Sequence, residues 1–403
     1  MTTLQQAALK IFRAAVKAAD PAAAVAAHLS DIGDFRRIYV IGAGKAAVSM
    51  AKAAEQILGS RIRAGLITTK YGHGGKLRRI RVQECGHPVP DANGVNGGEQ
   101  IANIAHSAGD GDLVVCLISG GASALLPLPS TGISLQEKQE VTRQLLARGA
   151  TIDEFNCVRK HMSRIKGGQL ARLASPAKVL TLILSDVIGD RLDVIGSGPT
   201  VPDPSTIADA QAVLEKYGMR AKLGEETPKP GDSLFRKVRN IVVGSNRQAV
   251  EAAAMRAREL GFRTSILSTQ IQGEAREIAR VHAAIAKEFL SQRKRVCILT
   301  GGEPTVTVRG QGLGGRNQEF ALAAAIDIAG LKNVLIFSAG TDGTDGPTDA
   351  AGAFATGKTG LHPGAQAALA DNDSYHFFEQ AGGLVKTGPS GTNVMDIQMI
   401  LVR

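Results

Sequence analysis

The amino-acid sequence predicts an α/β fold of two domains, the larger of them built on a mostly parallel, doubly wound sheet. The chain has 403 residues, which is long for one hydrophobic core and comfortable for two. Short runs rich in β-branched residues recur along it, each followed by a glycine-bearing turn and a segment of helical periodicity. Such units predict ligand binding at the carboxyl ends of the strands, in a cleft between two lobes.

Ten apolar runs are the predicted strands. They are Ile38–Ile41, Gly65–Thr68, Ile80–Glu84, Leu113–Ile118, Val179–Leu184, Ile241–Val243, Thr264–Leu267, Val296–Leu299, Val334–Phe337 and Met395–Val402. The segment Lys222–Asp232 contains two prolines and two glycines among charged residues, which is typical of a linker. We therefore predict domains of residues 1–233 and 234–403.

Neither a membrane span nor a signal peptide is predicted. The long uncharged stretch Leu113–Gln136 is interrupted by glycines and prolines. Near the N-terminus, Ile11 and Phe12 belong to an apolar stripe at helical spacing, with Lys10 and Arg13 between its members. This pattern predicts an amphipathic helix.

Charge and cysteine content favour a soluble cytoplasmic protein. The four cysteines lie far apart without a C-x-x-C pair, as expected of reduced core residues. The formal net charge of +10 would suit anionic substrates, but the basic residues are spread along the chain, so we expect no nucleic-acid partner.

The first predicted strand ends in the glycine turn Gly42-Ala43-Gly44-Lys45, where backbone N–H groups can approach a phosphate. The spacing matches the dinucleotide fingerprint G-x-G-x-x-A. However, the next strand ends in Thr68-Thr69-Lys70, without the acidic residue that would hold a ribose hydroxyl. A nicotinamide cofactor is therefore disfavoured, and Lys45 is either a phosphate ligand or a neighbour of a tight turn.

A second turn, Ser119-Gly120-Gly121-Ala122-Ser123, follows another predicted strand and could bind an anion or simply pack closely. Further along, Arg159, Ser163 and Lys166 share one face of a short helical stretch, which is compatible with a binding site or with a solvated face. His87, in Gly86-His87-Pro88, is open to either a structural or a functional interpretation.

Acidic residues follow two other strands, in Ser185–Asp190 and in Gly340–Gly346. Such oxygen ligands suit Mg²⁺ held together with substrate phosphates, although aspartate and glycine also fill turns for backbone reasons. The second predicted domain adds the turns Thr300–Pro304 and Gly312–Glu319. The arginine of the latter can bind phosphate through two donors.

Together these motifs resemble the class II glycerate 2-kinases, which pair a Rossmann-like N-terminal domain with a smaller C-terminal α/β domain of MOFRL type. The similarity spans nearly the whole chain and places the MOFRL-type region from about residue 294. It rests on the blocks already quoted, in one order, together with Gly86–Asp91, Asn156 with Arg159–His161, and Ser197–Thr200.

The resemblance implies an ATP-dependent kinase that uses Mg²⁺ or another divalent cation and converts D-glycerate to 2-phosphoglycerate in the interdomain cleft. Lys45 and Arg316 match key active-site positions of the family. The expected catalytic residues are Lys45, Arg316 and Asp186; the substrate ligands are Ser119, Gly120, Gly121, Ser123 and Arg159; the nucleotide ligands are Gly42, Gly44, Gly301, Gly302, Glu303, Gly315 and Asn317; and the metal ligands are Asp190 and Asp342.

D-Glycerate and ATP are the expected partners, and a homodimer is compatible with the sequence. Two alternatives remain open. The family has also carried the label hydroxypyruvate reductase, an NAD(P)H-dependent activity, and a basic binding protein without catalytic chemistry would share the composition.

Overall fold

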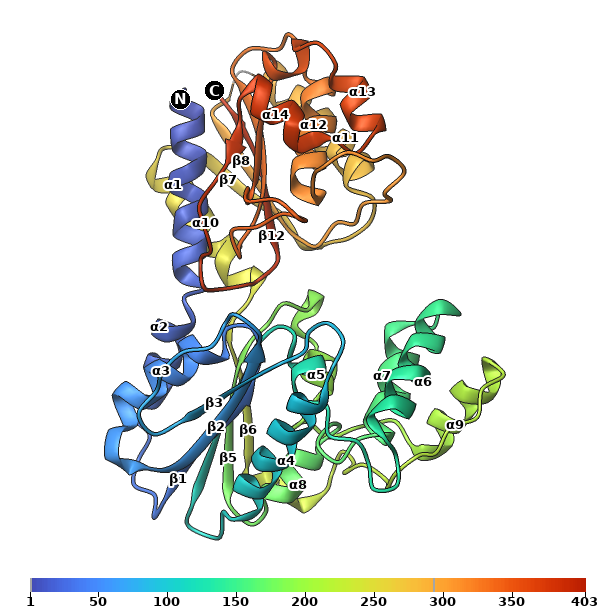
Figure 1. Cartoon of the computed structure of the whole chain (residues 1–403). Coiled ribbons are helices and arrows are strands. Elements are labelled where there is room, and N and C mark those ends of the chain that lie inside the picture. Colours follow the sequence, from blue (N-terminus) through green and yellow to red (C-terminus); the bar gives the residue numbers. More distant parts are fainter. Residues whose placement is uncertain (1, 293) are drawn as a thin grey trace. The chain divides into compact units, whose positions relative to one another are not determined.

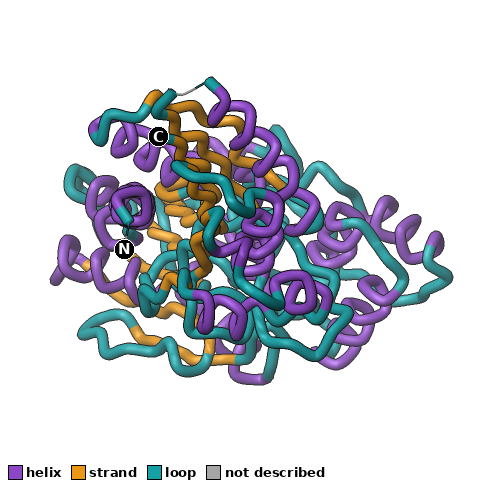
Figure 2. Tube along the Cα trace, turned by 90° about the horizontal axis from the view of Figure 1, so that it is seen from above, coloured by secondary structure: helices purple, strands orange, loops and turns teal. Residues whose placement is uncertain are grey.

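A computed structural model describes residues 2–292 and 294–403. It divides into two compact units, Pro21–Val243 (the first unit) and Met1–Asp20 together with Gly244–Arg403 (the second unit). Both mix helices with strands (Figures 1 and 2).

The first unit contains the following elements: α2 Pro21–Leu29, β1 Ile38–Ala43, α3 Ala47–Leu58, η1 Gly59–Arg61, β2 Ile62–Lys70, β3 Arg81–Cys85, α4 Ala92–His106, β4 Leu113–Ile118, α5 Ala122–Leu125, α6 Leu135–Ala147, α7 Ile152–His161, α8 Gln169–Ala174, β5 Lys178–Leu184, η2 Ile188–Asp190, η3 Ile195–Ser197, α9 Ile207–Lys216, η4 Ser233–Lys237 and β6 Val238–Gly244.

The sheet of the first unit has the order β3-β2-β1-β4-β5-β6, and the neighbouring strands from β3 to β5 are parallel. Helices α2 and α3 lie on one side of it, and α4 and α8 on the other (Figure 1). Strands β1 and β4 are buried along their whole length, which explains their unbroken apolar sequences. Because the strand order reverses between β1 and β4, the crevice beyond their carboxyl ends is the expected ligand site.

Capping residues mark the start of several helices. Ser134 and Glu137 form a capping box at the start of α6, and Thr151 and Glu154 form another at α7. These caps satisfy N–H groups that the first helical turn would leave unpaired. They fix where α6 and α7 begin, and these two helices carry residues of the candidate site.

The second unit contains α1 Thr3–Ala18, α10 Asn246–Glu259, β7 Arg263–Ile271, α11 Ala275–Ser291, β8 Val296–Gly302, α12 Arg316–Asp327, β9 Val334–Gly340, β10 Gly352–Thr356, η5 Thr359–Leu361, α13 Ala365–Ala370, α14 Ser374–Ala381, β11 Leu384–Val385 and β12 Asp396–Val402. Its sheet has the order β11-β10-β9-β12-β8-β7. Strand β12 runs antiparallel to both β8 and β9, whereas β7 and β8 are parallel. The second sheet is therefore mixed.

The predicted N-terminal helix exists as α1, and it packs in the second unit. Ile11 and Phe12 are buried, and the ring centroid of Phe12 lies 5.2 Å from that of Phe337 on β9. At the end of this segment, the Thr392 hydroxyl donates a hydrogen bond to the carbonyl of Ala19 at 2.6 Å. Residues at the two ends of the chain thus share one core.

The structural division differs from the predicted boundary at residue 233 in two places. Residues 1–20 belong to the second unit, because α1 covers its sheet, and β6 belongs to the first sheet, which moves the later division to Val243/Gly244. The predicted linker Lys222–Asp232 lies inside the first unit, where Glu226 accepts a hydrogen bond from His161 at 3.0 Å.

All ten predicted strands are present with modest changes at their ends. The sequence analysis missed β10 and β11. Strand β10 is the alanine- and glycine-containing sequence GAFAT, and β11 has two residues, so neither shows the β-branched run that marks the other strands.

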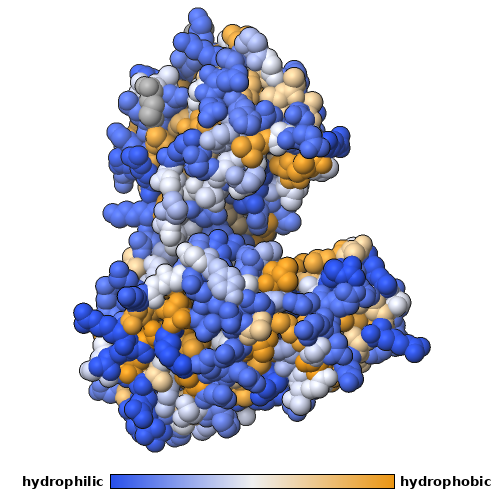
Figure 3. All heavy atoms as spheres, in the orientation of Figure 1, coloured by the Kyte–Doolittle hydropathy of each residue, from blue (hydrophilic) through white to orange (hydrophobic). Residues whose placement is uncertain are grey.

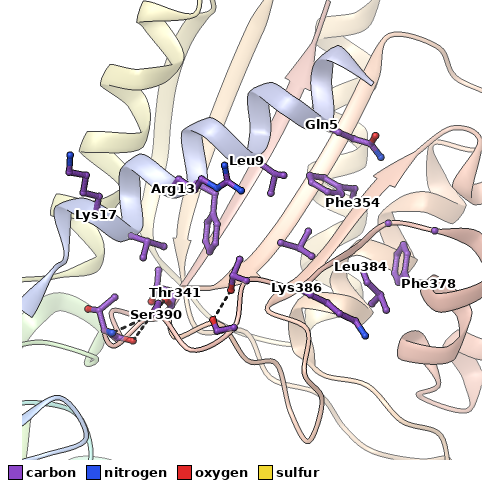
Figure 4. A pocket seen from close by; sticks show the side chains of 18 of the residues that line it. Gln5, Leu9, Arg13, Lys17, Thr341, Phe354, Phe378, Leu384, Lys386 and Ser390 are labelled. Carbon is purple, nitrogen blue, oxygen red and sulfur yellow. Dashed lines mark hydrogen bonds between the residues drawn. The ribbon is translucent and has the colours of Figure 1, made fainter. Parts of the chain in front are cut away.

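A cavity of about 1010 Å³ lies in the second unit between α1 and the part of the sheet near β10 and β11. Figure 4 shows Leu9, Phe354 and Leu384 among its apolar lining residues and Arg13 and Lys386 among its cationic ones.

On the face drawn in Figure 3, hydrophilic and hydrophobic residues alternate in small groups over both units. Among the helices of residues 2–292 and 294–403, none combines the length and the apolar character needed to cross a bilayer.

Candidate active site

The turn after β1 brings the ends of β1 and β4 close together. A Cβ built on Gly42 would lie 2.2 Å from the carbonyl oxygen of Leu117, and one built on Gly44, whose φ is +138°, would lie 2.1 Å from Oγ of Ser119. Only glycine allows this approach. The Lys45 N–H then donates to the carbonyl of Gly120 at 2.9 Å. The two predicted anion turns therefore form one bonded structure.

The turn after β4 completes this structure. The Ser119 hydroxyl accepts a hydrogen bond from the Ala46 N–H at 3.0 Å, just before α3 begins. Gly121 has a φ of +82°, which favours glycine, and it precedes α5. The Ser119 side chain thus has a structural bond of its own. At the switch point of the sheet Gly120 is buried and Gly121 is partly exposed.

Asp186, two residues after the end of β5, lies against this turn. A Cβ built on Gly120 would be 2.0 Å from Oδ2 of Asp186. Burial raises the pKa of the Asp186 carboxyl, and the positive charge of Lys45 acts in the opposite direction. The structure therefore brings Lys45, Gly120 and Asp186 together, as the sequence predicts, and gives Asp186 an environment suited to accepting a proton.

His87 also faces this turn. A Cβ built on Gly121 would be 2.9 Å from Nε2 of His87 and 3.4 Å from Cε of Lys45. Burial lowers the pKa of His87, and the charges of Lys45 and Lys70 lower it further. The imidazole is therefore kept neutral beside the lysine. Sequence reasoning left His87 undecided, because the position of the β3–α4 loop over Gly121 has no local signal.

Polar groups continue from α5 into η3. The hydroxyl groups of Ser123 and Ser197 lie 2.6 Å apart, and the Ser197 hydroxyl donates to Oδ1 of Asn156 at 3.2 Å. Nδ2 of Asn156 is buried without a hydrogen-bond partner in the described part of the chain. Ser123 thus belongs to a buried hydrogen-bonded chain.

Arg159 faces a cavity of about 820 Å³ in the first unit. Gly121, Ser123, His87 and Lys138 line the same cavity, so it is shared by three of the five predicted substrate ligands, whereas Ser119 and Gly120 do not line it. Burial lowers the pKa of Arg159 to about 10, and its guanidinium carbon lies 4.7 Å from the ring centroid of Phe155. Sequence analysis missed Lys138, which lies within a helical pattern typical of an exposed surface.

In the second unit, Arg316 begins α12 and is held by two acids. Its guanidinium donates to the buried Asp396 at 2.5 and 3.0 Å and forms an ion pair with Glu303 at 3.0 Å. Burial works against its charge, but hydrogen bonding to Asp396 and the Asp396 charge outweigh this and raise the pKa of Arg316. Glu303 and Arg316, predicted separately, thus lie together, and Asp396 is an unpredicted partner.

The other predicted residues of the second unit hold the start of α12 or pack closely. Asp345 accepts hydrogen bonds from the backbone N–H groups of Asn317 and Gln318 at 3.1 and 2.8 Å. A Cβ on Gly315 would lie 2.3 Å from Cγ of Asp345. Burial raises the pKa of Asp345 to about 6. A nucleotide role for Gly315 and Asn317 stays a prediction.

Gly301 and Gly302, at the end of β8, have a packing explanation. A Cβ on Gly301 would be 1.9 Å from Oδ1 of Asn246, and one on Gly302 would be 2.2 Å from the carbonyl oxygen of Ile271. Close contacts with α10 and β7 are thus sufficient to require glycine at these positions.

The predicted metal ligands Asp190 and Asp342 lie in different units, after β5 and after β9. Within residues 2–292 and 294–403, no group of three or more His, Cys, Asp or Glu side chains is arranged to hold a metal ion. Mg²⁺ commonly needs only one or two carboxylates when substrate phosphates supply the other oxygens. A metal role for Asp190 and Asp342 stays a prediction.

Comparison with known proteins adds to this geometry. Residues 7–229 match a domain family described as a domain of unknown function, DUF4147, and residues 296–396 match the MOFRL family. D-Glycerate 2-kinase of Thermotoga maritima is 42% identical, over 99% of this chain and 99% of that protein. The chain belongs to the glycerate kinase family.

Solved structures agree with this assignment. The crystal structure of glycerate kinase (EC 2.7.1.31) from Thermotoga maritima matches with a TM-score of 0.95, 42% identity and full coverage of both chains. A relative from Agrobacterium vitis carries the name putative hydroxypyruvate reductase and is 44% identical, over 98% of this chain and 93% of that protein. The predicted glycerate kinase fold, with a MOFRL domain, is confirmed.

Proposed function

We propose that this member of the glycerate kinase family is a D-glycerate 2-kinase, which transfers the γ-phosphoryl group of ATP to the 2-hydroxyl of D-glycerate. One observation carries the proposal. Lys45, Asp186 and the Ser119–Gly121 turn meet at the reversal point of the first sheet, where a cation and a carboxylate adjoin one tight glycine turn.

Phosphoryl transfer depends mainly on alignment and charge neutralisation. The 2-hydroxyl oxygen attacks the γ-phosphorus, the bond to the β–γ bridging oxygen breaks, and ADP leaves. Lys45 would stabilise the negative charge on the transferred group. Asp186 would accept the hydroxyl proton, a role that suits a buried carboxyl with a raised pKa.

Ser123 and Arg159 would hold the glycerate carboxylate, because both line the cavity beside Gly121. Arg316 would act on the phosphates from the second unit, oriented by Asp396 and Glu303. A divalent cation, held by Asp190 or Asp342 with ATP oxygens, would supply further charge neutralisation when bound. The four free cysteines are all buried, which supports our proposal of a cytoplasmic location.

The alternative is an NAD(P)H-dependent hydroxypyruvate reductase, the activity in the name of the Agrobacterium vitis relatives. The residues after β1 allow it, since the glycine spacing of Gly42 and Gly44 occurs in dinucleotide sites. The end of β2 does not favour it. Thr68 and Thr69 are fully buried and Lys70 follows, so an acid for the ribose hydroxyls is missing from that position.

Two assays on the purified full chain separate these functions. With D-glycerate and Mg-ATP, ADP release measured through pyruvate kinase and lactate dehydrogenase should require glycerate. With hydroxypyruvate, NADH and NADPH should not be consumed. NAD(P)H oxidation without glycerate-dependent ADP release would reverse the assignment. An enolase-coupled assay that yields phosphoenolpyruvate without a mutase identifies the product as the 2-phosphate.

A further inference from the structure

Three cations of the first unit, of which two are buried and the third, Arg159, is partly exposed, lie close to one another without acidic partners. Lys138 on α6 is 4% exposed and Lys166, which follows α7, is 0% exposed; Arg159 on α7 has a buried Nε without a hydrogen-bond partner among the described residues. None of the three forms an ion pair within residues 2–292 and 294–403. Uncompensated buried charge costs several kcal/mol, on the order of the total stability of a small domain.

A neighbouring lysine shows that the fold pairs buried charge elsewhere. Lys160 is as buried as Lys138, and it contacts Asp203 at 3.2 Å and Asp193 at 3.9 Å. Lys138 instead donates to the carbonyl of Met162 at 3.2 Å. Lys166 donates to the carbonyls of Ser123 and Gly196 at 2.9 and 3.3 Å. The absence of an acidic partner is therefore specific to this cluster, and a bound anion would compensate its charge.

The cluster lies at a cavity. Lys138, Arg159 and Ser123 line the space of about 820 Å³ that also reaches Gly121, beside Cε of Lys45. Lys166 lies behind the wall, bonded to the backbone of Ser123. Resting on the proposed kinase function, we propose that Lys138 and Arg159 bind the carboxylate of the acceptor, that Lys166 strengthens this site from behind Ser123, and that binding transfers one proton from solvent to Lys138.

The protonation step follows from the surroundings of Lys138. Burial and the charge of Arg159 lower its pKa to about 7. A bound carboxylate would favour the ammonium and raise that pKa again. The charged and titratable groups that surround Lys138 are Arg159 and Lys166 from the α7 side, His87 from the opposite side of the cavity, and Glu140 and Arg143 on α6 itself. Glu140 and Arg143 are exposed and pair with each other at 2.5 Å, so neither compensates the cluster.

His87 also lines the cavity, and it changes its protonation in a lower pH range than Lys138. Burial and the charges of Lys45 and Lys70 lower its pKa below the usual 6.5, so it stays neutral above pH 7. Proton uptake between pH 7 and 9 therefore reports on Lys138. Burial and the charges of Arg159 and Lys138 lower the pKa of Lys166 well below its usual value. Its Nζ donates to the carbonyls of Ser123 and Gly196 and does not face the cavity.

Isothermal titration of the full chain with D-glycerate, without nucleotide, tests the proposal. Measurements at pH 8 in buffers of different ionisation enthalpy give the number of protons taken up. With a pKa of about 7 in the empty site, uptake should approach one proton at pH 8 and fall to roughly a tenth of a proton at pH 6, and Kd should rise about tenfold per pH unit above 7. Glycerol, which lacks the carboxylate, should not bind.

Two variants locate the proton. Lys138→Met keeps the length of the side chain without its charge, so uptake should vanish and Kd at pH 7 should rise on the order of tenfold or more. Lys138→Arg keeps a permanent charge, so its Kd should lose the pH dependence. Lys52→Met, the same change at an exposed lysine of α3 that does not line this cavity, should shift Kd less than about twofold. Thermal melts of each variant check the fold.

Several results would overturn the proposal: glycerate binding without proton uptake, unchanged uptake in Lys138→Met, or inorganic phosphate binding in place of glycerate. The ADP-release assay is independent of these results. If the wild type phosphorylates glycerate but takes up no proton, the kinase function stands and this inference fails. If no glycerate-dependent ADP appears, the function itself fails.

Discussion

The carboxylate of Asp186 lies against the α-carbon of Gly120, where a single added methyl group would be 2.0 Å from Oδ2. Gly120→Ala should therefore displace the Asp186 carboxylate and lower kcat. Asp186→Asn should lower kcat to a similar extent, by about a hundred- to ten-thousandfold if Asp186 accepts the proton. Steady-state kinetics at saturating glycerate measure both variants.

The double variant Gly120→Ala/Asp186→Asn sharpens this test. If both changes act through one carboxylate, the double variant should be little slower than either single one. Gly109→Ala is the control, because its nearest atom is Nη2 of Arg36 at 3.1 Å, the end of a flexible side chain. If the loss in kcat of the double variant equals the product of the two single losses, Gly120 does not act through Asp186.

Lys45→Ala should remove most of kcat, because Lys45 is proposed to stabilise charge that develops during transfer. Losing one such contact typically costs on the order of a hundred- to a thousandfold in rate, roughly 3 to 4 kcal/mol. Lys45→Arg should also be impaired, since it replaces a compact ammonium by a wider planar guanidinium at a tight glycine turn. Near-normal kcat in Lys45→Ala would remove it from the mechanism.

Arg316→Ala should lower both activity and stability. Arg316 neutralises Asp396, which is 0% exposed. Leaving that carboxylate unpaired should cost on the order of 3 to 5 kcal/mol. Arg316→Ala/Asp396→Asn should recover much of the stability without recovering kcat. Denaturant unfolding with kinetics on the same samples decides the matter, and recovery of both would assign Arg316 a purely structural role.

Phe12→Ala should destabilise the second unit by about 3 to 5 kcal/mol, the usual cost of emptying a buried aromatic site. Phe12 is 2% exposed and meets Phe337 on β9. The exposed Lys10 of the same helix provides the control, since Lys10→Ala should change stability by less than about 0.5 kcal/mol. Hydrogen exchange of β9 amides should increase in Phe12→Ala, and unchanged exchange there would contradict the packing of α1.

The sequence predicted those parts of the fold and site that depend on local chemistry. Gly42, Gly44 and the Ser119–Gly121 turn were found because glycine and hydroxyl groups at a strand end have a local signature. Partners that meet only through packing were missed. Asp396 reads as an ordinary strand residue, and its bond to Arg316 joins positions far apart in the chain.

Lys138 was missed for a similar reason. Its helix has the charge pattern of a solvated surface, and only the packing of α7 beside it shows that the lysine is buried. The structural division of the chain also depends on packing. The linker composition of Lys222–Asp232 is real, but the strand that follows it completes the first sheet.

The division of the second unit between both ends of the chain also matters during synthesis on the ribosome. Residues 1–20 leave the exit tunnel well before the strands that cover Ile11 and Phe12, because β9 and β12 lie beyond residue 333. The nascent chain must therefore carry an uncovered apolar helix while the whole first unit folds. We expect chaperones to bind this segment during synthesis. A tag fused before Thr3 would interfere with the packing of α1 onto the second sheet, which is a late step of folding.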